Sequence, residues 1–123
     1  MKINWKIDNN RPIYIQLLEQ LKIKIVSGEI PIGSKIESVR NLAQDAEVNP
    51  NTMQKALAEL EREGLVFSKR TSGRYVTDDK EKIEKIREEM ANIHINSLKE
   101  TLKKLGYKQC EIIEIIKEKL EEE

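Results

Sequence analysis

The segment from Glu47 to Val66, EVNPNTMQKALAELEREGLV, specifies the start, the buried face and the end of one helix. Asn49 is a favourable N-cap, and Pro50 suits the first helical position because an N–H there would have no helical partner. Gly64 is a typical residue for ending a helix. The apolar residues that recur at helical spacing, and that we expect to be buried, are Met53, Ala56, Leu57 and Leu60.

Two other helices are expected ahead of this one. The segment PIYIQLLEQLKIKIVSG begins with Pro12, ends at Gly28 and carries a broad apolar face between them. After a turn at PIGSKI, a shorter helix follows Ser38, whose hydroxyl can cap the first exposed amides. The inner face of the shorter helix is expected to consist of Val39, Leu42, Ala43 and Ala46.

A hairpin is expected after the third helix. The sequence LVFSKRTSGRYV predicts two short strands at 65–69 and 74–76, joined by a turn at 71–73. Three helices followed by a basic hairpin is the element order of a winged helix. We therefore expect a mainly α fold with a small β wing, in which residues 1–77 form a winged helix-turn-helix domain.

The chain changes character after Thr77. From Ile83 to Leu105 apolar residues recur at spacings of three and four, which predicts a helix of about 27 residues, and a last helix is expected near 108–122. Two such helices cannot bury their apolar faces on each other alone, so residues 78–123 are expected to form a dimerisation segment that pairs with a second copy. The residues expected at this interface are Ile83, Ile86, Met90, Ile93, Leu102, Leu105, Ile112, Ile113, Ile116 and Leu120.

Charge is distributed unevenly, although the whole chain has a formal net charge of +0. Residues 1–77 carry 12 Lys and Arg against 9 acidic residues, whereas residues 78–123 carry 10 against 13. A basic first part and an acidic second part fit a small DNA-binding module with a separate association segment. The same asymmetry can arise by chance, so it adds only weak support.

Catalysis is not indicated by the residues. The single histidine, His94, has no Cys, Ser or spaced His to join it in a zinc site or a catalytic triad. The single cysteine, Cys110, cannot form an intramolecular disulfide, and at the start of an apolar helix it is expected to be a buried small hydrophobic residue. The isolated glycines form no phosphate-binding loop. We expect no enzymatic activity, no cofactor and no bound metal.

The N-terminal region has no apolar run of signal-peptide length, and no run of about 18 apolar residues occurs in the chain. We therefore expect a cytoplasmic protein that does not bind a membrane.

The exposed side of the third helix carries amide and ammonium groups near its start and acids further on. Asn51 and Gln54 can pair with adenine edges, and Lys55 can reach guanine or phosphate, so this helix suits entry into a DNA major groove by its first turns. The alternative interpretation is that this side of the helix is an ordinary polar surface that faces solvent and does not bind DNA. The polar and cationic residues that a winged helix would bring to the same surface are Ser38, Arg40, Lys69, Arg70 and Arg74.

Other interpretations remain open for these residues. Arg40 could instead pair with Asp45 or Glu37, and the hairpin cations could be ordinary protection of an edge strand. The winged helix could also be a protein-interaction module without sequence-specific DNA binding. A protein-binding surface should, however, carry aromatic or apolar anchors, and these positions are polar.

The segment SGEIPIGSKIESVRNLAQDAEVNPNTMQKALAELEREGLVFSKRTSGRYV closely resembles the N-terminal domain of GntR-family bacterial transcription regulators. The family pattern runs G-x-(I/L)-x-x-G-x-x-L-P-S-x-R-x-L-A, then V-N/S-x-x-T-V, then A-L-x-x-L-x-x-E-G, then a basic wing that ends in F/Y-V. The resemblance covers Arg11 to Val76, and the short tail of two helices resembles the YtrA-type subfamily. It implies a homodimeric repressor that binds a pseudo-palindromic operator, with half-sites about 34 Å apart, and that controls a transporter operon.

The resemblance also implies which residues meet double-stranded DNA. Glu37 departs from the pattern because it replaces the usual proline, and it adds negative charge near the expected phosphates; Arg74 stands where the family often has threonine. The residues identify no small-molecule effector, although segment 77–86 or the dimer seam could admit one. The positions expected to contact DNA are Ser38, Arg40, Asn49, Pro50, Asn51, Thr52, Gln54, Lys55, Arg70, Thr71, Ser72 and Gly73.

Overall fold

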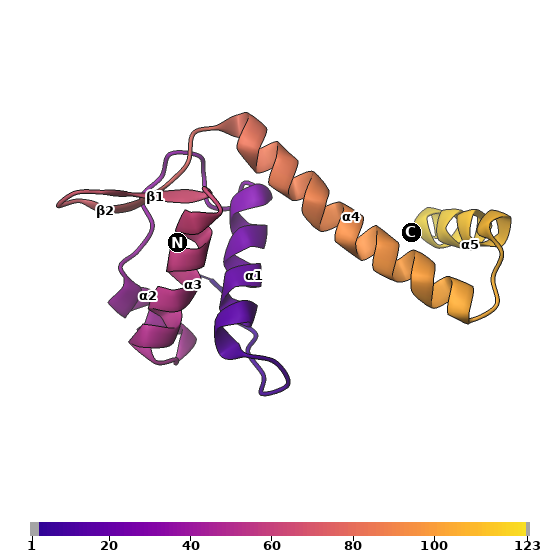
Figure 1. Cartoon of the computed structure of the whole chain (residues 1–123), viewed down its shortest axis with the longest axis horizontal. Coiled ribbons are helices and arrows are strands. Elements are labelled where there is room, and N and C mark those ends of the chain that lie inside the picture. Colours follow the sequence, from indigo (N-terminus) through magenta and orange to yellow (C-terminus); the bar gives the residue numbers. More distant parts are fainter. Residues whose placement is uncertain (1–2, 123) are drawn as a thin grey trace. The chain divides into compact units, whose positions relative to one another are not determined.

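The computed structural model describes residues 3–122, which form five helices and one two-stranded sheet in this part of the chain (Figure 1). The order is α1 (Ile13–Val26), α2 (Val39–Ala46), α3 (Pro50–Arg62), β1 (Val66–Lys69), β2 (Gly73–Val76), α4 (Lys80–Lys104) and α5 (Gln109–Glu121). This order confirms the expected mainly α fold with a small wing. The chain divides into two compact units, and the division falls inside α4, between Arg87 and Glu88.

Helix α3 is the centre of the first unit, because α1, α2 and β1 all pack against it. Its four expected core residues, Met53, Ala56, Leu57 and Leu60, are completely inaccessible to solvent. Leu17 and Leu21 of α1 and Leu42 of α2 are buried as well. The helix-period patterns therefore identified the core of α3 correctly, whereas in α2 Leu42 and Ala43 are buried and Val39 and Ala46 are only partly covered. The expected boundary between the domains at 77/78 lies before α4, whereas Ile83 and Ile86 in the first two turns of α4 are buried within this first unit.

The starts of α2 and α3 are capped as their sequences predict. The Ser38 hydroxyl accepts a hydrogen bond from the Asn41 N–H at 3.1 Å, and the Asn49 side-chain oxygen accepts one from the Asn51 N–H at 2.7 Å. Between these helices Glu47 adopts the left-handed conformation, with φ of 57°, which produces the tight turn. The capped N-termini of α2 and α3 therefore follow each other closely along the chain.

The hairpin is antiparallel and pairs Val66 with Val76 and Lys69 with Gly73. At its tip Gly73 has φ of 115°, a conformation that residues with side chains rarely adopt. The segment before α2 also pairs with β2, which the sequence did not indicate. The Ile36 N–H donates to the Arg74 carbonyl oxygen at 2.9 Å, and the Val76 N–H donates to the Ser34 carbonyl oxygen at 2.9 Å. The entrance to α2 is thus attached directly to the wing.

Two glutamines of α1 hold the N-terminal segment, because their side-chain amides form hydrogen bonds with its backbone N–H and C=O groups. Gln20 accepts from the Lys6 N–H at 3.0 Å and donates to the Lys6 carbonyl oxygen at 2.8 Å. Gln16, which is buried, pairs in the same way with Asp8 and also donates to the Arg11 carbonyl oxygen at 2.9 Å. A buried amide is tolerated here because its hydrogen bonds are made. The apolar pattern of α1 did not predict this polar contact.

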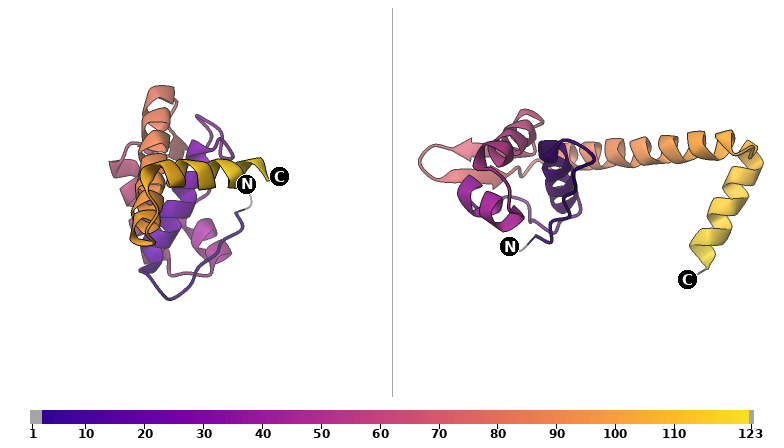
Figure 2. Two further views of the ribbon diagram at one scale, coloured as in Figure 1. Left: turned by 90° about the vertical axis from the view of Figure 1, so that its right-hand side faces the viewer. Right: turned by 90° about the horizontal axis from the view of Figure 1, so that it is seen from below.

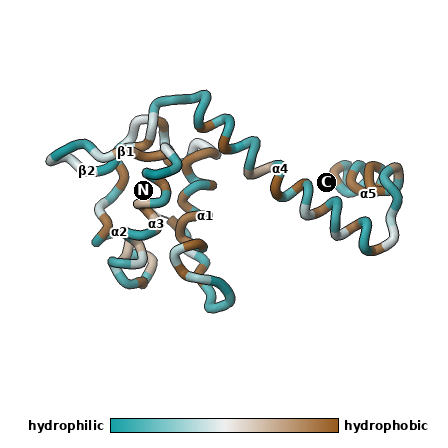
Figure 3. The backbone as a smooth tube through the Cα atoms, viewed as in Figure 1, coloured by the Kyte–Doolittle hydropathy of each residue, from teal (hydrophilic) through white to brown (hydrophobic). Residues whose placement is uncertain are grey.

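The second unit consists of the rest of α4 and α5. Figure 3 shows hydrophobic positions interspersed with hydrophilic ones along both helices. Gly106, with φ of 98°, follows the end of α4, and α5 buries Ile112. Among the described residues, no helix is long and apolar enough to cross a membrane.

Candidate nucleic-acid interface

The beginning of α2, the beginning of α3 and the tip of the hairpin contribute the predicted DNA-binding residues. Figure 1 and the right-hand view of Figure 2 both place α2 and the hairpin tip on the same side of the first unit. The residues predicted in α2 and in the wing are therefore presented toward the same side of the first unit. A helix N-terminus carries unpaired N–H groups and a partial positive charge, both of which favour phosphate.

The first turns of α3 present the predicted polar residues to solvent. Asn51, Gln54 and Lys55 are exposed, whereas Thr52 is partly covered. Pro50 and Asn49 are exposed at the helix start, where Asn49 is already engaged in the cap. The amide side chains of Asn51 and Gln54 suit hydrogen bonding to base edges in a major groove.

Lys55 has a partner that the sequence did not reveal. Its ammonium nitrogen lies 3.9 Å from the centroid of the Tyr14 ring in α1. A cation over an aromatic face is attracted by about 0.5–1 kcal/mol at an exposed site. Tyr14 therefore restricts where the Lys55 ammonium can lie. No local pattern would have predicted the pair, because it depends on how α1 packs against α3.

The start of α2 presents Ser38 and Arg40, which are both exposed. Within residues 3–122, Arg40 forms no ion pair, so the alternative pairing with Glu37 or Asp45 does not occur. Glu37 is also exposed. Arg40 is consequently available as a cation beside the N-terminus of α2.

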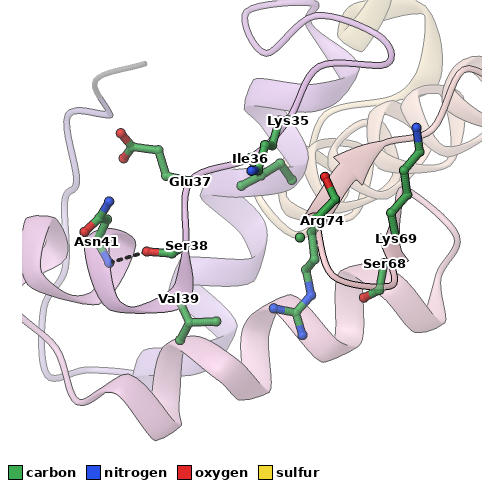
Figure 4. Close-up of a pocket in the computed structure, with 11 residues that line it drawn as sticks. Lys35, Ile36, Glu37, Ser38, Val39, Asn41, Ser68, Lys69 and Arg74 are labelled. Atoms are coloured by element: carbon green, nitrogen blue, oxygen red, sulfur yellow. Dashed lines mark hydrogen bonds between the residues drawn. The ribbon is translucent and has the colours of Figure 1, made fainter.

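An open groove of about 730 Å³ separates the start of α2 from the hairpin (Figure 4). It brings Ser38 together with Ser72 and Gly73 of the wing, as predicted for one shared surface. Lys35, which the sequence did not single out, is exposed beside them. The complete lining consists of Lys35, Ile36, Glu37, Ser38, Val39, Asn41, Ser68, Lys69, Ser72, Gly73 and Arg74.

The two cations at the wing tip, Lys69 and Arg70, differ in their contacts within the protein. The Lys69 ammonium lies 4.5 Å from the centroid of the Tyr75 ring, and the Ser72 and Tyr75 hydroxyl groups are hydrogen-bonded to each other. Arg70 and Thr71 are exposed, and Arg70 makes no ion pair in the described part of the chain. Arg70 is therefore the cation of the tip that is available to a phosphate.

The acids in the second half of α3 are occupied by contacts within the protein. Glu63 accepts a hydrogen bond from Lys22 of α1 at 2.8 Å. Glu59 is hydrogen-bonded twice by Arg62, and these bonds hold the pKa of Glu59 below its ordinary value. This pairing supports the interpretation that only the first turns of α3 face DNA.

Glu61 links α3 to both strands of the wing. One of its oxygens, Oε1, accepts from the Ser68 hydroxyl at 2.9 Å and from Arg74 Nε at 3.2 Å. A second open groove, of about 440 Å³, is lined by Gln54, Ala58, Glu61, Arg62 and Arg74. Arg74 thus borders both grooves, one beside Ser38 and the other beside Gln54.

The apolar residues expected at a dimer interface fall into three groups. Ile83, Ile86 and Ile112 are buried within the single chain, and Met90, Leu102 and Ile116 are partly covered. The exposed members are Ile93, Leu105, Ile113 and Leu120, and two further residues of α4 that were not predicted at the interface, Ile95 and Leu98, are also exposed.

The expectation of a buried Cys110 is wrong, because its side chain is exposed. The reason is the rotation of α5: Ile112 is the residue that the helix buries, and two residues along a helix correspond to about 200° of rotation. Cys110 therefore lies on the side of α5 away from Ile112.

Comparison with known proteins gives a consistent result. Residues 13–76 match the gntR family of bacterial regulatory proteins. The uncharacterized HTH-type transcriptional regulator YhcF of Bacillus subtilis is 30% identical over 112 residues, covering 91% of this chain and 93% of YhcF. The HTH-type transcriptional repressor YtrA of the same organism is 41% identical over 71 residues, which are 58% of this chain and 55% of YtrA.

Solved structures resemble both the whole chain and the winged helix. A GntR family transcriptional regulator from Listeria monocytogenes superposes with a TM-score of 0.87 at 37% identity, covering 91% of this chain and 98% of that one. AraR(DBD), solved in complex with operator ORX1, superposes with a TM-score of 0.57 at 26% identity, covering 63% of this chain and 99% of AraR(DBD).

Proposed function

The chain belongs to the gntR family of bacterial regulatory proteins and is a transcriptional regulator with a DNA-binding winged helix, and from this premise we propose that it acts as a homodimeric, sequence-specific repressor. Its ligand would be a pseudo-palindromic operator. Each protomer would place the first turns of α3 in a major groove, with the wing beside the adjacent backbone. A bacterial protein that acts on chromosomal DNA would work in the cytoplasm.

The observation that carries this proposal is the convergence of exposed polar groups from three elements. Ser38 and Arg40 come from the start of α2, Gln54 comes from α3, and Arg70 comes from the wing tip. The acids of α3 are held in contacts within the protein, so the first turns of α3 present amide and ammonium groups without competing carboxylates. The structure of AraR(DBD) with an operator supports DNA as the partner of this kind of domain.

A homodimer would follow from the exposed apolar side chains of the second unit. Ile93 is 66% exposed and Leu120 is 75% exposed, and side chains of this size favour burial against another surface. Two half-sites about 34 Å apart, one turn of DNA, would match a two-fold symmetric pair.

We also assign the chain to the YtrA-type subfamily and its operator to a transporter operon. The support is the similarity to the repressor YtrA, at 41% identity over 58% of this chain, together with the two helices that follow the wing. Selecting bound duplexes from a random pool, and then searching for that site upstream of the gene's own operon, would test the assignment. Footprinting at physiological salt that revealed no preferred site would contradict sequence-specific binding.

Replacing Arg40 with alanine should weaken binding to every DNA sequence, because Arg40 is an unpaired cation beside the N-terminus of α2. We expect about a tenfold loss of affinity and a salt dependence whose slope is smaller by about 1 per protomer. Titrations of a labelled duplex at several salt concentrations would measure both. Arg87→Ala is the control, because it removes the same charge from an exposed position on α4. Equal losses in the two variants would contradict a specific role for Arg40.

Replacing Lys55 with alanine should instead change which sequence is preferred. We expect the discrimination at one base position in each half-site to fall by about 1 kcal/mol or more, because the ammonium group reaches a base edge from the first turns of α3. Repeating the selection with the variant would show this as a position that becomes variable. Lys85→Ala on α4 provides a matched loss of one exposed lysine. An unchanged selected site would mean that Lys55 does not contact a base.

A further inference from the structure

Arg74 lies between the parts of the candidate interface, and the sequence pattern places it on the same surface as Ser38 and Arg40, but the family resemblance does not include it among the residues that contact DNA. It belongs to β2, and its side chain is 19% exposed. Figure 4 shows it extending from the hairpin toward α3. It borders the groove that contains Ser38 and Ser72 as well as the groove that contains Gln54. It is therefore the side chain that connects the parts of this surface contributed by α2, α3 and the wing.

The guanidinium of Arg74 is held in position by one carboxylate oxygen. Its Nε donates to Glu61 Oε1 at 3.2 Å, and the Ser68 hydroxyl donates to the same oxygen at 2.9 Å. Glu61 belongs to α3, whereas Ser68 and Arg74 lie on opposite strands of the wing and face each other in the register. The carboxylate consequently holds Nε of the guanidinium near α3 and near both strands.

The two terminal nitrogens of Arg74 remain available. Of the side-chain nitrogens of Arg74, only Nε takes part in the hydrogen bond and ion pair with Glu61. Within residues 3–122, the sole buried side-chain nitrogen or oxygen without a partner is Nε1 of Trp5. The terminal nitrogens of Arg74 are therefore unpaired and reached by solvent. Together they offer a planar fork of N–H donors, which matches the two oxygens of a phosphate.

We propose that Arg74 binds a phosphate of the DNA backbone through its two terminal nitrogens, while Glu61 holds the guanidinium through Nε. The inference deepens the proposed function, since it assumes that DNA lies across this face. Arginine is suited to both tasks at once because its donors are fixed in one rigid plane. The contact would fall between the helix start at Ser38 and the recognition residue Gln54, where a phosphate fixes the register of the protein on the duplex.

A competing explanation is that the Arg74–Glu61 pair only braces the wing. The two explanations differ in the salt dependence of DNA binding, because a bound phosphate releases counterions and an internal brace does not. They also differ in the effect of Glu61→Gln. If Arg74 touches phosphate, the loss of its anchor weakens binding; if it does not, removal of a negative charge from this face strengthens binding.

The experiment uses the full chain and two duplexes, the selected operator and a random sequence of equal length. For Arg74→Ala we expect about a tenfold loss of affinity on both duplexes and a salt slope smaller by about 1 per protomer. Arg74→Lys keeps the positive charge, but a lysine ammonium cannot bind Glu61 and form two hydrogen bonds to one phosphate at the same time. Its affinity for DNA should therefore lie between those of Arg74→Ala and the native chain. Arg87→Ala, with the same loss of charge on α4, should keep the native slope.

Glu61→Gln is then measured alone and in combination with Arg74→Ala. We expect Glu61→Gln to weaken DNA binding when Arg74 is present. When Arg74 is replaced by alanine, the same substitution should strengthen DNA binding about twofold, because it then only removes the repulsion between the Glu61 carboxylate and the phosphates. The same sign in both backgrounds, or a native salt slope in Arg74→Ala, would overturn the phosphate contact. A phosphate contact should be seen on the random duplex as well, because it does not depend on sequence. The proposed sequence-specific function is tested separately, by whether an operator is selected at all. Thermal unfolding of each variant checks that the fold is intact.

Discussion

At micromolar concentration the chain should sediment as a particle of twice its 14.3 kDa mass, and the double substitution Ile113→Lys with Leu120→Lys should convert it to a monomer. These residues are 59% and 75% exposed, and seven positions apart they lie on nearly the same side of α5. In the proposed symmetric dimer, two lysines per chain would place four charges where the interface would otherwise carry apolar groups. Operator affinity should fall about 10²–10⁴-fold, because the second half-site would no longer be bound as an intramolecular event.

A matched variant separates dimerisation from charge. Glu118→Gln on another side of α5, with Glu122→Gln at its C-cap, changes the net charge by the same amount, and both residues are exposed. This control should remain dimeric and keep the operator affinity of the native chain or exceed it. Analytical ultracentrifugation and operator titration on the same samples would measure both quantities. A native chain that sediments as a monomer at micromolar concentration would contradict our account of the tail.

Leu57→Ala should have the largest effect on folding stability. Leu57 is completely buried in α3, against which α1, α2 and β1 pack, so no neighbouring element can easily fill the space that a smaller side chain leaves. We expect the free energy of unfolding to fall by about 2–5 kcal/mol and the melting temperature to fall on the order of 10 °C. Urea titration followed by circular dichroism would measure the loss.

Ile23→Ala is the control for this substitution. Ile23 lies in α1 of the same unit but is 50% exposed, so the same kind of truncation removes little buried contact. Its cost should be no more than about 1 kcal/mol. Similar losses for the two variants would show that α3 is not the principal support of the domain. In samples kept well below the transition, Leu57→Ala should still recognise the operator, because Leu57 does not reach the surface.

The helices could be predicted because their signals lie within a few residues of one another. Asn49, Pro50 and Gly64 delimit α3 by local backbone chemistry, and Ser38 does the same for the start of α2. The wing could be predicted from strand-forming residues on either side of a glycine turn. The exposed tip of α3 followed from the same pattern, since the residues opposite a buried stripe face solvent.

The features that could not be predicted depend on partners far along the chain. Gln16 is buried although it is polar, because the N-terminal segment folds back to satisfy its amide. Tyr14 meets Lys55 only because α1 packs against α3. Arg74 and Glu61 are 13 residues apart, and nothing in either segment marks them as a pair. Cys110 was misplaced because the sequence does not show which side of α5 is covered.

The attachment of the segment before α2 to β2 affects the thermodynamics of binding. Hydrogen bonds from Ile36 to Arg74 and from Val76 to Ser34 join the entrance of α2 to the wing, so the two elements that we propose to face DNA are already ordered relative to each other in the free protein. Little conformational entropy is then lost when DNA is bound. The heat-capacity change of association should accordingly match the area buried at the interface alone, without a contribution from coupled folding.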